Sequence, residues 1–192
     1  MDITITPKDL VCHNVLAIGQ VNVSLELPKV VRLFKNAEYD ESKFNCVRVR
    51  VWKFRCTVAI FSSGKLQSTG APSTENAHLA LKFVAYRLRT MFPSVIFSGF
   101  RIENLLATFD IGARMDLYGL SRDPALTVTY MPQQFAAAVV REVALQTGVV
   151  VDVFSTGKMN IKGRGGMESI CKGVNSLMPG IAKHLCEDLA LE

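Results

Sequence analysis

The sequence lacks the patterns that mark zinc-binding, disulfide-rich and membrane-spanning proteins. Its five cysteines form no Cys-X-X-Cys pair and it has only three histidines, which argues against a structural zinc site. The odd number of cysteines argues against a disulfide framework, so we expect reduced thiols. No apolar run is long enough to span a bilayer, and we expect no signal peptide.

Motifs for catalysis are also missing. We find no nucleophile–base pair, carboxylate dyad or Walker loop, so we expect neither an enzyme nor a bound cofactor. Low-complexity and acidic runs are missing too, and the apolar fraction of 49% is ordinary for a folded protein. The net charge of +5 is compatible with a polyanionic partner but does not by itself require one.

What the sequence does contain is an internal repeat. Four pairs of residues recur in order: Asn14 and Asn104, Phe44 and Phe135, Phe61 and Phe154, and Lys65 and Lys158. The members of these pairs lie 90, 91, 93 and 93 residues apart. A fixed period indicates one supersecondary unit used twice, which builds a surface of approximate twofold symmetry. Paired aromatic residues near basic residues on such a surface suit a symmetric polymer such as duplex DNA.

The two halves predict the same order of elements. For the first half we expect strands at residues 9–23, 44–53, 56–62 and 65–70, a short helix at 27–35 and a long helix from 73 or 74 to 91. For the second half we expect strands at residues 100–109, 135–143, 149–154 and 158–163, a short helix at 113–120 and a final helix with its apolar face at 170–185. The repeats would span residues 1–97 and 98–192, and the short link between them favours one continuous sheet.

Alternation along the strands assigns the two faces of this sheet. In residues 44–52 the valines take odd positions, whereas Phe44, Arg48 and Arg50 take even ones. Side chains alternate across a sheet, so the valines are expected to face the long helices and the arginines the open face. An open face that carries aromatic, basic and amide side chains is typical of a ligand-binding surface.

Several motifs in this order resemble the core of the TATA-box-binding protein family. They are Asn-Ala-Glu-Tyr at 36–39, Ile-Phe-Ser-Ser-Gly-Lys at 60–65, Ser-Thr-Gly-Ala at 68–71 and Ile-Glu-Asn at 102–104. The resemblance extends from residue 7 to residue 186 and suits a divergent eukaryotic or viral member. It implies an α+β saddle, in which two pseudo-symmetric repeats form one curved antiparallel sheet with helices on the convex face.

The resemblance also implies a function. Members of this family are general initiation factors that bind the minor groove of A/T-rich, TATA-like promoter DNA and nucleate the preinitiation complex. They bend the DNA by inserting apolar wedges between base steps, a mechanism described for the TATA-binding protein itself. The residues that would form the two wedge pairs are Phe44, Phe61, Phe135 and Phe154.

Further roles follow from the same motifs. Asn14 and Asn104 would bond base acceptors at the centre of the site, and Thr69 would assist them. The other side chains expected on the groove floor are Gln67, Asn160 and Lys162. The expected phosphate contacts, whose affinity falls with salt, are Arg48, Arg50, Lys65, Arg141 and Lys158.

The second repeat departs from the family pattern. Lys162 stands where the family has threonine, and Asp152 stands where it has an apolar residue. We expect these two to form an ion pair across one hairpin, because an acid near phosphates is otherwise unfavourable. Gln67 and Asn160 replace valines that help to exclude the guanine amino group, so we expect a relaxed or shifted base preference.

The surfaces expected to bind partner proteins also differ from the family pattern. Met131 and Gln133 replace glutamates in the surface that receives transcription factor IIB, and two extra residues lie in the turn at 144–148. Lys82, Arg87 and Arg89 form a basic patch on the long helix, either simply solvated or a partner site. The expected partners are promoter DNA, factors similar to IIB and IIA, and RNA polymerase machinery, without a membrane or a small-molecule substrate. The expected location is the nucleus, or a viral factory or virion.

Two other readings stay open. The same scaffold could serve as a protein-interaction module or regulator with weak or altered DNA binding, which Asp152 and Lys162 favour. It also occurs as an accessory domain of base-repair enzymes, although this is an analogy of fold. The four phenylalanines favour the DNA-bending factor over both.

Overall fold

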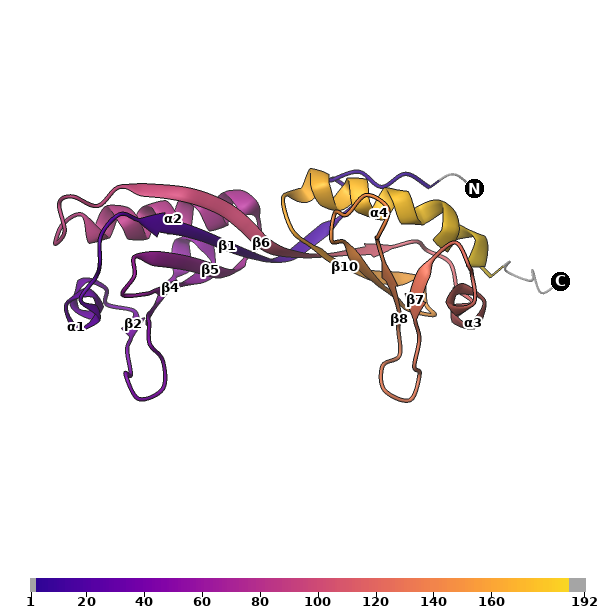
Figure 1. The fold of residues 1–192 in the computed structure, drawn as a ribbon, viewed down its shortest axis with the longest axis horizontal. Helices are drawn as coiled ribbons and strands as arrows, with labels where there is room; N and C mark the ends of the chain where they lie inside the picture. Colours follow the sequence, from indigo (N-terminus) through magenta and orange to yellow (C-terminus); the bar gives the residue numbers. More distant parts are fainter. Residues whose placement is uncertain (1–2, 187–192) are drawn as a thin grey trace. The chain divides into compact units, whose positions relative to one another are not determined.

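The computed structural model describes residues 3–186, which form ten strands and four α-helices (Figure 1). The strands are β1 Val11–Val21, β2 Ala37–Glu38, β3 Val47–Val51, β4 Cys56–Ile60, β5 Lys65–Ala71, β6 Phe97–Asp110, β7 Thr127–Thr129, β8 Ala138–Arg141, β9 Val150–Val153 and β10 Lys158–Gly163. The α-helices are α1 Leu27–Val30, α2 Thr74–Leu88, α3 Leu117–Ser121 and α4 Met167–Ile181. Short 3-10 turns are η1 Val31–Leu33, η2 Trp52–Phe54 and η3 Ala182–His184.

The described chain divides into two compact units, which we call the first unit (residues 13–104) and the second unit (residues 3–12 and 105–186). Strands β1 and β6 contribute residues to both. The sheet order is β2-β3-β4-β5-β1-β6 in the first unit and β1-β6-β10-β9-β8-β7 in the second, and every pairing in the described ladders is antiparallel. The repeat boundary between residues 97 and 98 stays a prediction.

Helix α2 covers one face of the sheet in the first unit. Ser73 caps its first turn by accepting a hydrogen bond from the Asn76 N–H at 3.1 Å, as the sequence predicted. Its buried residues are those of the predicted apolar face: Ala77, Ala80, Leu81, Val84, Ala85 and Leu88. They pack against β4 and β5. The helix ends at Leu88 rather than at residue 91.

Helix α4 has the same role in the second unit, where it packs against β10. The segment before β1 lies beside it: the Ile5 N–H donates to Asn175 Oδ1 and Asn175 Nδ2 donates to the Ile5 carbonyl, both at 2.8 Å. Pro179 lies in the last turn of α4, and the helix ends two residues later. Leu185, predicted on the apolar face of this helix, instead follows η3 and forms an isolated bridge with Met115.

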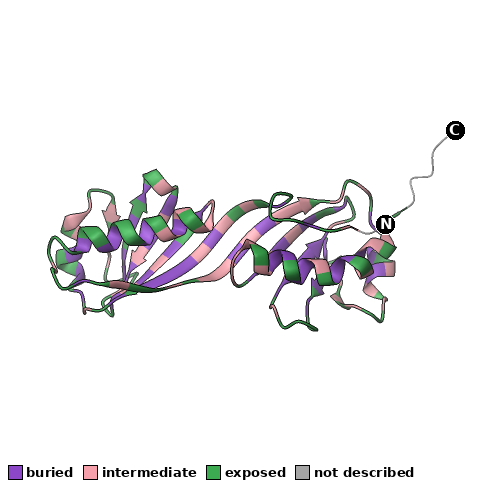
Figure 2. Cartoon of the chain, turned by 90° about the horizontal axis from the view of Figure 1, so that it is seen from above, coloured by how far each residue is buried: buried purple, intermediate pink, exposed green. Residues whose placement is uncertain are grey.

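Exposure alternates along the strands, as Figure 2 shows. In β3 the three valines are buried and the two arginines are exposed, which confirms the predicted assignment of the faces. In each unit the loop before β3 or β8 extends on the side of the sheet away from the long helix (Figure 1). The predicted α+β fold, a repeated antiparallel sheet with helices on one face, is confirmed.

Several predicted boundaries were wrong. The short helices are shorter than expected, because the residues before Leu117 form a bend and the isolated bridge of Met115, and those after Val30 continue only as the 3-10 turn η1. The edge strands β2 and β7 were not predicted, since two or three residues carry no measurable alternation. The extra residues of the second repeat lie in the long connection between β8 and β9, at 142–149, as expected.

Candidate nucleic-acid interface

Two hairpin turns hold a phenylalanine beside a lysine in each unit. In the first unit the Phe61 N–H donates to the Lys65 carbonyl at 2.9 Å. In the second unit the Phe154 N–H donates to the Lys158 carbonyl, also at 2.9 Å. The duplicated Phe-Ser-X-Gly-Lys motif therefore builds the same turn twice, and each turn presents an aromatic and a basic side chain together.

Glycine is required in both turns. Gly64 and Gly157 have φ angles of +81° and +88°, a region that L side chains rarely adopt. A Cβ on either residue would also collide with a backbone carbonyl oxygen, that of Val21 or that of Ala113. The backbone of the turn thus explains why both motifs place glycine directly before lysine.

The other two candidate wedge residues lie in loops, not in strands. The Phe44 N–H donates to the Asp40 carbonyl at 2.8 Å, and the Phe135 N–H donates to the Met131 carbonyl at 2.9 Å. Strands β3 and β8 begin three residues after each phenylalanine, so the prediction of strands starting at 44 and 135 was wrong. The side chains are exposed, Phe44 at 48% and Phe135 at 45%.

The carboxylate of Asp40 stabilises the loop of Phe44. Its Oδ1 accepts from the N–H and the hydroxyl of Ser42 at 3.1 and 2.6 Å, and its Oδ2 lies 2.9 Å from Lys43 Nζ. These hydrogen bonds, that of the Ser42 hydroxyl first, hold the pKa of Asp40 below its ordinary value. The loop is therefore held by an ionised aspartate at neutral pH.

In the first unit each candidate wedge ring contacts a cation. The guanidinium of Arg48 lies 5.3 Å from the centroid of the Phe44 ring. The ammonium of Lys65 lies 5.7 Å from the centroid of the Phe61 ring. Both distances are within the range of cation–π attraction, which orients an exposed ring without burying it.

In the second unit the two rings contact each other. Phe135 and Phe154 have centroids 6.0 Å apart and ring planes at 72°, an edge-to-face pair. Arg141 on β8 and Lys158 on β10 are exposed on the same unit. The structure thus brings together the second aromatic pair, while the first pair is held by its basic neighbours.

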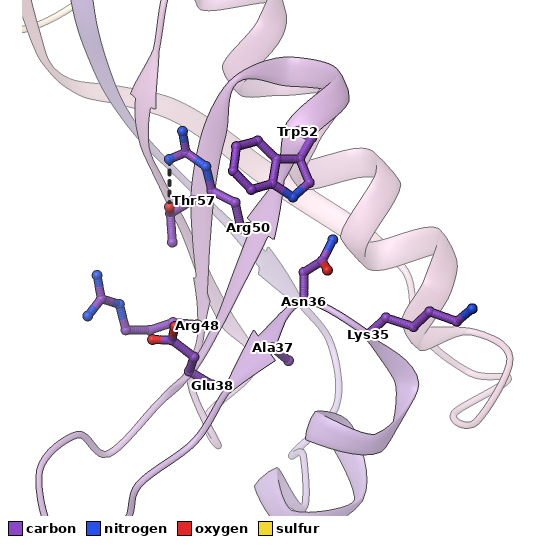
Figure 3. Close-up of a pocket in the computed structure, with 8 residues that line it drawn as sticks. All are labelled: Lys35, Asn36, Ala37, Glu38, Arg48, Arg50, Trp52 and Thr57. Atoms are coloured by element: carbon purple, nitrogen blue, oxygen red, sulfur yellow. Dashed lines mark hydrogen bonds between the residues drawn. The ribbon is translucent and has the colours of Figure 1, made fainter.

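Arg50 lies at the edge of a pocket of about 420 Å³ in the first unit (Figure 3). Its Nη1 donates to the Thr57 hydroxyl at 3.2 Å, and its guanidinium lies 5.0 Å from the centroid of the Trp52 ring. The pocket is lined by Lys35, Asn36, Ala37, Glu38, Arg48, Arg50, Trp52 and Thr57. Trp52 is 67% exposed and was not among the predicted site residues, although its even position two residues after Arg50 was a usable signal.

The two repeated asparagines lie on the two strands that run through both units. Asn14 on β1 is half-buried, and its Oδ1 accepts a hydrogen bond from the Gly70 N–H at 2.7 Å. This bond fixes the orientation of the amide, because the oxygen faces β5 and the NH₂ group is left to donate elsewhere. Asn104 on β6 is also half-buried, and Thr69 on β5 is exposed next to Gly70.

The predicted ion pair of the second repeat is present. Lys162 Nζ lies 2.6 Å from Asp152 Oδ2. Asn160 is the direct cross-strand partner of Asp152, so Lys162 lies diagonal to the acid, as expected. In the first unit the matching pair is Ala59 and Gln67.

Asp152 is more deeply buried than the sequence predicted. It was predicted to be an outward-facing acid, but it is only 3% exposed. Its cross-strand partners are Val139 on β8 and Asn160 on β10, so Asp152 lies within the open face, and its low exposure shows that it does not project from that face.

The predicted partner residues have different surroundings. Met131 and Gln133 are exposed in the loop before β8. Arg87 donates to the Leu33 carbonyl at 3.2 Å, so part of its role is structural. Lys82 and Arg89 line a smaller pocket of about 210 Å³ that also includes exposed Tyr86 and Ile96.

Metal binding and membrane insertion have no candidate elements within residues 3–186. Within this range no three His, Cys, Asp or Glu side chains are arranged to hold a metal ion. No described helix is long and apolar enough to cross a membrane. The features that the described residues do offer are the aromatic, basic and amide side chains of the open faces.

The fold is a duplicated antiparallel sheet that helices cover on one face. Its open faces carry aromatic and basic side chains, which defines a ligand-binding sheet protein. Comparison with known proteins identifies the family. Residues 9–91 and 99–184 match the family model of transcription factor TFIID, or TATA-binding protein. The chain therefore belongs to the TATA-binding protein family, whose members are non-enzymatic DNA-binding transcription factors.

Individual relatives agree with this assignment. The TATA-box-binding protein of Spodoptera frugiperda is 30% identical over 167 residues, which cover 87% of this chain and 54% of that protein. TATA-box-binding protein 2 of Entamoeba histolytica is 29% identical over 177 residues, or 92% of this chain and 82% of the relative. The TBP structure from Methanococcus jannaschii superposes with a TM-score of 0.78 at 26% identity, covering 91% of this chain and 99% of that one. The chain thus spans about half the length of the insect relative.

Proposed function

We propose that the chain is a general transcription initiation factor that binds the minor groove of A/T-rich, TATA-like promoter DNA and bends it. Phe44 with Phe61, and Phe135 with Phe154, insert at the two ends of the site, as wedges do in the TATA-binding proteins themselves. Binding of this kind nucleates the assembly of a preinitiation complex. The matched placement of these four phenylalanines, one in a hairpin turn and one in a loop of each unit, is the single observation that carries the proposal.

Exposure of the rings supports a wedge role. Phe44 and Phe135 are 48% and 45% exposed although both are large and apolar. Rings in such positions cost free energy in water unless a partner covers them. Unstacking a base step costs a few kcal/mol, which is offset by the protein surface that the widened groove then contacts.

Polar side chains on the open faces supply the remaining contacts. Because Asn14 Oδ1 accepts from Gly70, its NH₂ group is the part that donates to the N3 and O2 acceptors of A·T pairs. Asn104 has the corresponding role in the other half of the site. Thr69 and Gln67 contact bases in the half that Asn14 contacts. Phosphates are contacted by Arg48, Arg50, Lys65, Arg141 and Lys158, which makes the affinity strongly dependent on salt.

The loop before β8 meets a factor similar to IIB. Its exposed residues Met131 and Gln133 offer an apolar and a neutral surface, so the partner surface has to be less basic than one that meets glutamates. Factors similar to IIA and RNA polymerase machinery complete the assembly, with Lys82, Arg87 and Arg89 as a second contact surface on α2. The place of action is the nucleus, or the viral factory or virion for a viral protein.

One observation favours a second candidate function, a protein-interaction module or regulator with weak or altered DNA binding. Asp152 places a buried carboxylate in the open face of the second unit. An acid in this face disfavours a polyanion and favours a basic partner segment, although Lys162 compensates for its charge. The four rings favour the DNA-bending function over this alternative.

A bending assay tests the proposal. A/T-rich duplexes that carry a donor and an acceptor dye at their ends are titrated with the wild-type chain and with the double variant Phe61→Ala/Phe154→Ala. We expect the wild type to raise energy transfer and the double variant to lose this rise. The control is Tyr86→Ala, which removes an exposed aromatic side chain from α2 and should bend DNA like the wild type. Tight binding of the wild type without any bend would contradict the wedge mechanism.

A further inference from the structure

A carboxylate oxygen in the open face of the second unit is buried without a hydrogen-bond partner. Asp152 lies on β9 directly across from Asn160 on β10 and from Val139 on β8. Its Oδ2 is paired with Lys162 Nζ at 2.6 Å. Its Oδ1 is buried and accepts no hydrogen bond within residues 3–186. One half of the carboxylate is therefore satisfied and the other half is not.

The fold itself does not require this acid. In the first unit the matching residue is Ala59, which pairs with Gln67 in the same register as Asp152 with Asn160. Leaving a buried charged oxygen without a donor lowers stability, whereas a ligand that supplies a donor recovers that loss on binding. A carboxylate accepts several hydrogen bonds, so Oδ1 has capacity for such a ligand while Oδ2 stays paired with Lys162. The unpaired oxygen thus points to a ligand that carries a hydrogen-bond donor.

The floor of the DNA minor groove offers one kind of donor. A·T and T·A pairs present only the acceptors N3 of adenine and O2 of thymine, while a G·C pair adds the 2-amino group of guanine. Facing A·T, the carboxylate of Asp152 would meet acceptors alone. Facing G·C, it would accept from the amino group, and the ammonium of Lys162, which has three N–H donors, would serve a neighbouring acceptor. The carboxylate therefore matches the G·C edge and mismatches the A·T edge, whereas the ammonium of Lys162 can serve an acceptor of either.

We propose that Asp152, held in place by Lys162, reads the 2-amino group of guanine, so that the half-site bound by the second unit contains a G·C pair. This inference rests on the proposed function, because the open face has to lie against the minor groove. Oδ1 is buried in the free chain, so this contact requires the side chains around it to move when DNA binds, while the Lys162 ammonium keeps its ion pair with Oδ2.

The test varies one chemical group of the DNA. Each position of an A/T-rich site is replaced in turn by G·C, by inosine·C or by 2,6-diaminopurine·T. Inosine lacks the 2-amino group of guanine, and diaminopurine adds that group to adenine, so the two control pairs separate the amino group from the rest of the base. At one position we expect the wild type to bind the two duplexes that carry the amino group about tenfold more tightly than the two that lack it.

Variants assign the preference to Asp152. Asp152→Ala, which copies Ala59, should erase the preference for the amino group and bind the all-A/T duplex more tightly than the wild type does. Because this change leaves Lys162 without its partner, we would also measure the double variant Asp152→Ala/Lys162→Thr. This variant copies both counterparts in the first unit, Ala59 and Thr69. Tyr86→Ala on α2 is the matched control and should keep the wild-type preference.

The possible outcomes separate this inference from the proposed function. If the chain bends DNA but binds duplexes with and without the amino group equally well, only the proposal for Asp152 is overturned and the proposed function stands. A preference that persists in both Asp152 variants overturns the proposal for Asp152 as well. Failure to bind any duplex overturns both proposals, and binding of a lysine-rich peptide in that case, lost in Asp152→Ala, would make the open face a protein interface instead.

Discussion

The rings of Phe135 and Phe154 meet edge to face, with centroids 6.0 Å apart and planes at 72°. Their counterparts in the first unit, Phe44 and Phe61, instead contact the cationic groups of Arg48 and Lys65. Under the proposed function the second wedge is already assembled before DNA binds. The first wedge has to exchange its cation contacts for bases while the same cations turn to phosphates. The two ends of the site should therefore respond differently to substitution.

Single phenylalanine substitutions test the two wedges separately. Duplexes that carry 2-aminopurine at one end or the other of the site report unstacking by a rise in fluorescence. We expect Phe154→Ala to abolish the rise at one end only and Phe61→Ala to abolish it at the other, because each wedge acts at its own step. Each change should weaken binding by about tenfold, since loss of one wedge removes roughly 1–2 kcal/mol of contact.

Conservative variants provide the control for that experiment. Phe154→Leu and Phe61→Leu keep an apolar wedge and should retain most of the fluorescence rise. Loss of the signal at both ends from either alanine substitution would show that the steps open as one event. In that case the two units would not act as independent wedges.

Local signals in the sequence account for the parts of the fold that were predicted. The apolar face of α2 follows from helical periodicity, and its cap from Ser73. The turns at Gly64 and Gly157 follow from glycine at a fixed position before lysine, where φ is positive. Strand β10 was predicted with its observed bounds, because Gly157 and Gly163 delimit an alternating run.

Features that depend on several elements were not predicted. The loops of Phe44 and Phe135 are closed by backbone hydrogen bonds to Asp40 and Met131, and alternation of side chains gives no indication of where such a loop ends. Alternation placed Asp152 on the open face but did not give its depth, which depends on the residues paired with it on β8 and β10. The pocket beside Trp52 likewise requires β2, β3 and β4 together.

The orientation of the Asn14 amide leads to a second prediction. Asn14→Asp keeps an oxygen that accepts from the Gly70 N–H but removes the donor and adds a negative charge near the groove floor. We expect its affinity for an A/T-rich duplex to fall by more than about tenfold, with little change in melting temperature. Asn14→Ala loses the hydrogen bond too and should lower the free energy of unfolding by about 1 kcal/mol. Fluorescence anisotropy and thermal melting measure the two effects, and equal DNA affinity of wild type and Asn14→Asp would exclude base contact by this amide.

The hairpin turn of the second unit leads to a third prediction. Gly157 has a φ of +88°, and a Cβ there would collide with the Ala113 carbonyl oxygen. Gly112 in the same unit has a φ of +74° but no atom within 4 Å of an added Cβ. We expect Gly112→Ala to lower the free energy of unfolding by about 1 kcal/mol from backbone strain alone, and Gly157→Ala to lower it by roughly 3 kcal/mol or more. Urea unfolding measures both, and similar losses would mean that the turn accommodates the methyl group by shifting.

The long β8–β9 connection makes stability depend on pH. Glu142 Oε1 accepts from the Leu145 N–H, and its Oε2 accepts from the N–H and hydroxyl of Thr147 at 2.8 and 2.7 Å. These hydrogen bonds, that of the Leu145 N–H first, hold the pKa of Glu142 below its ordinary value in the folded chain. A carboxyl whose pKa is lower in the folded state contributes stability above its unfolded pKa, and this contribution is lost as the pH falls through the folded value.

Glu142→Gln should therefore be less stable than the wild type at pH 7, and the difference should begin to narrow as the pH falls below about 4.3, the ordinary pKa of glutamate, and narrow further toward the lower pKa of the folded chain. Urea unfolding at pH 7, 5 and 3.5 measures this difference. Glu41→Gln, in the exposed loop of the first unit, removes the same charge without the three hydrogen bonds and should give a small, nearly constant difference. A stability difference for Glu142→Gln that stays the same at all three pH values would show that the loop is held by packing of its side chains and not by the ionised carboxylate.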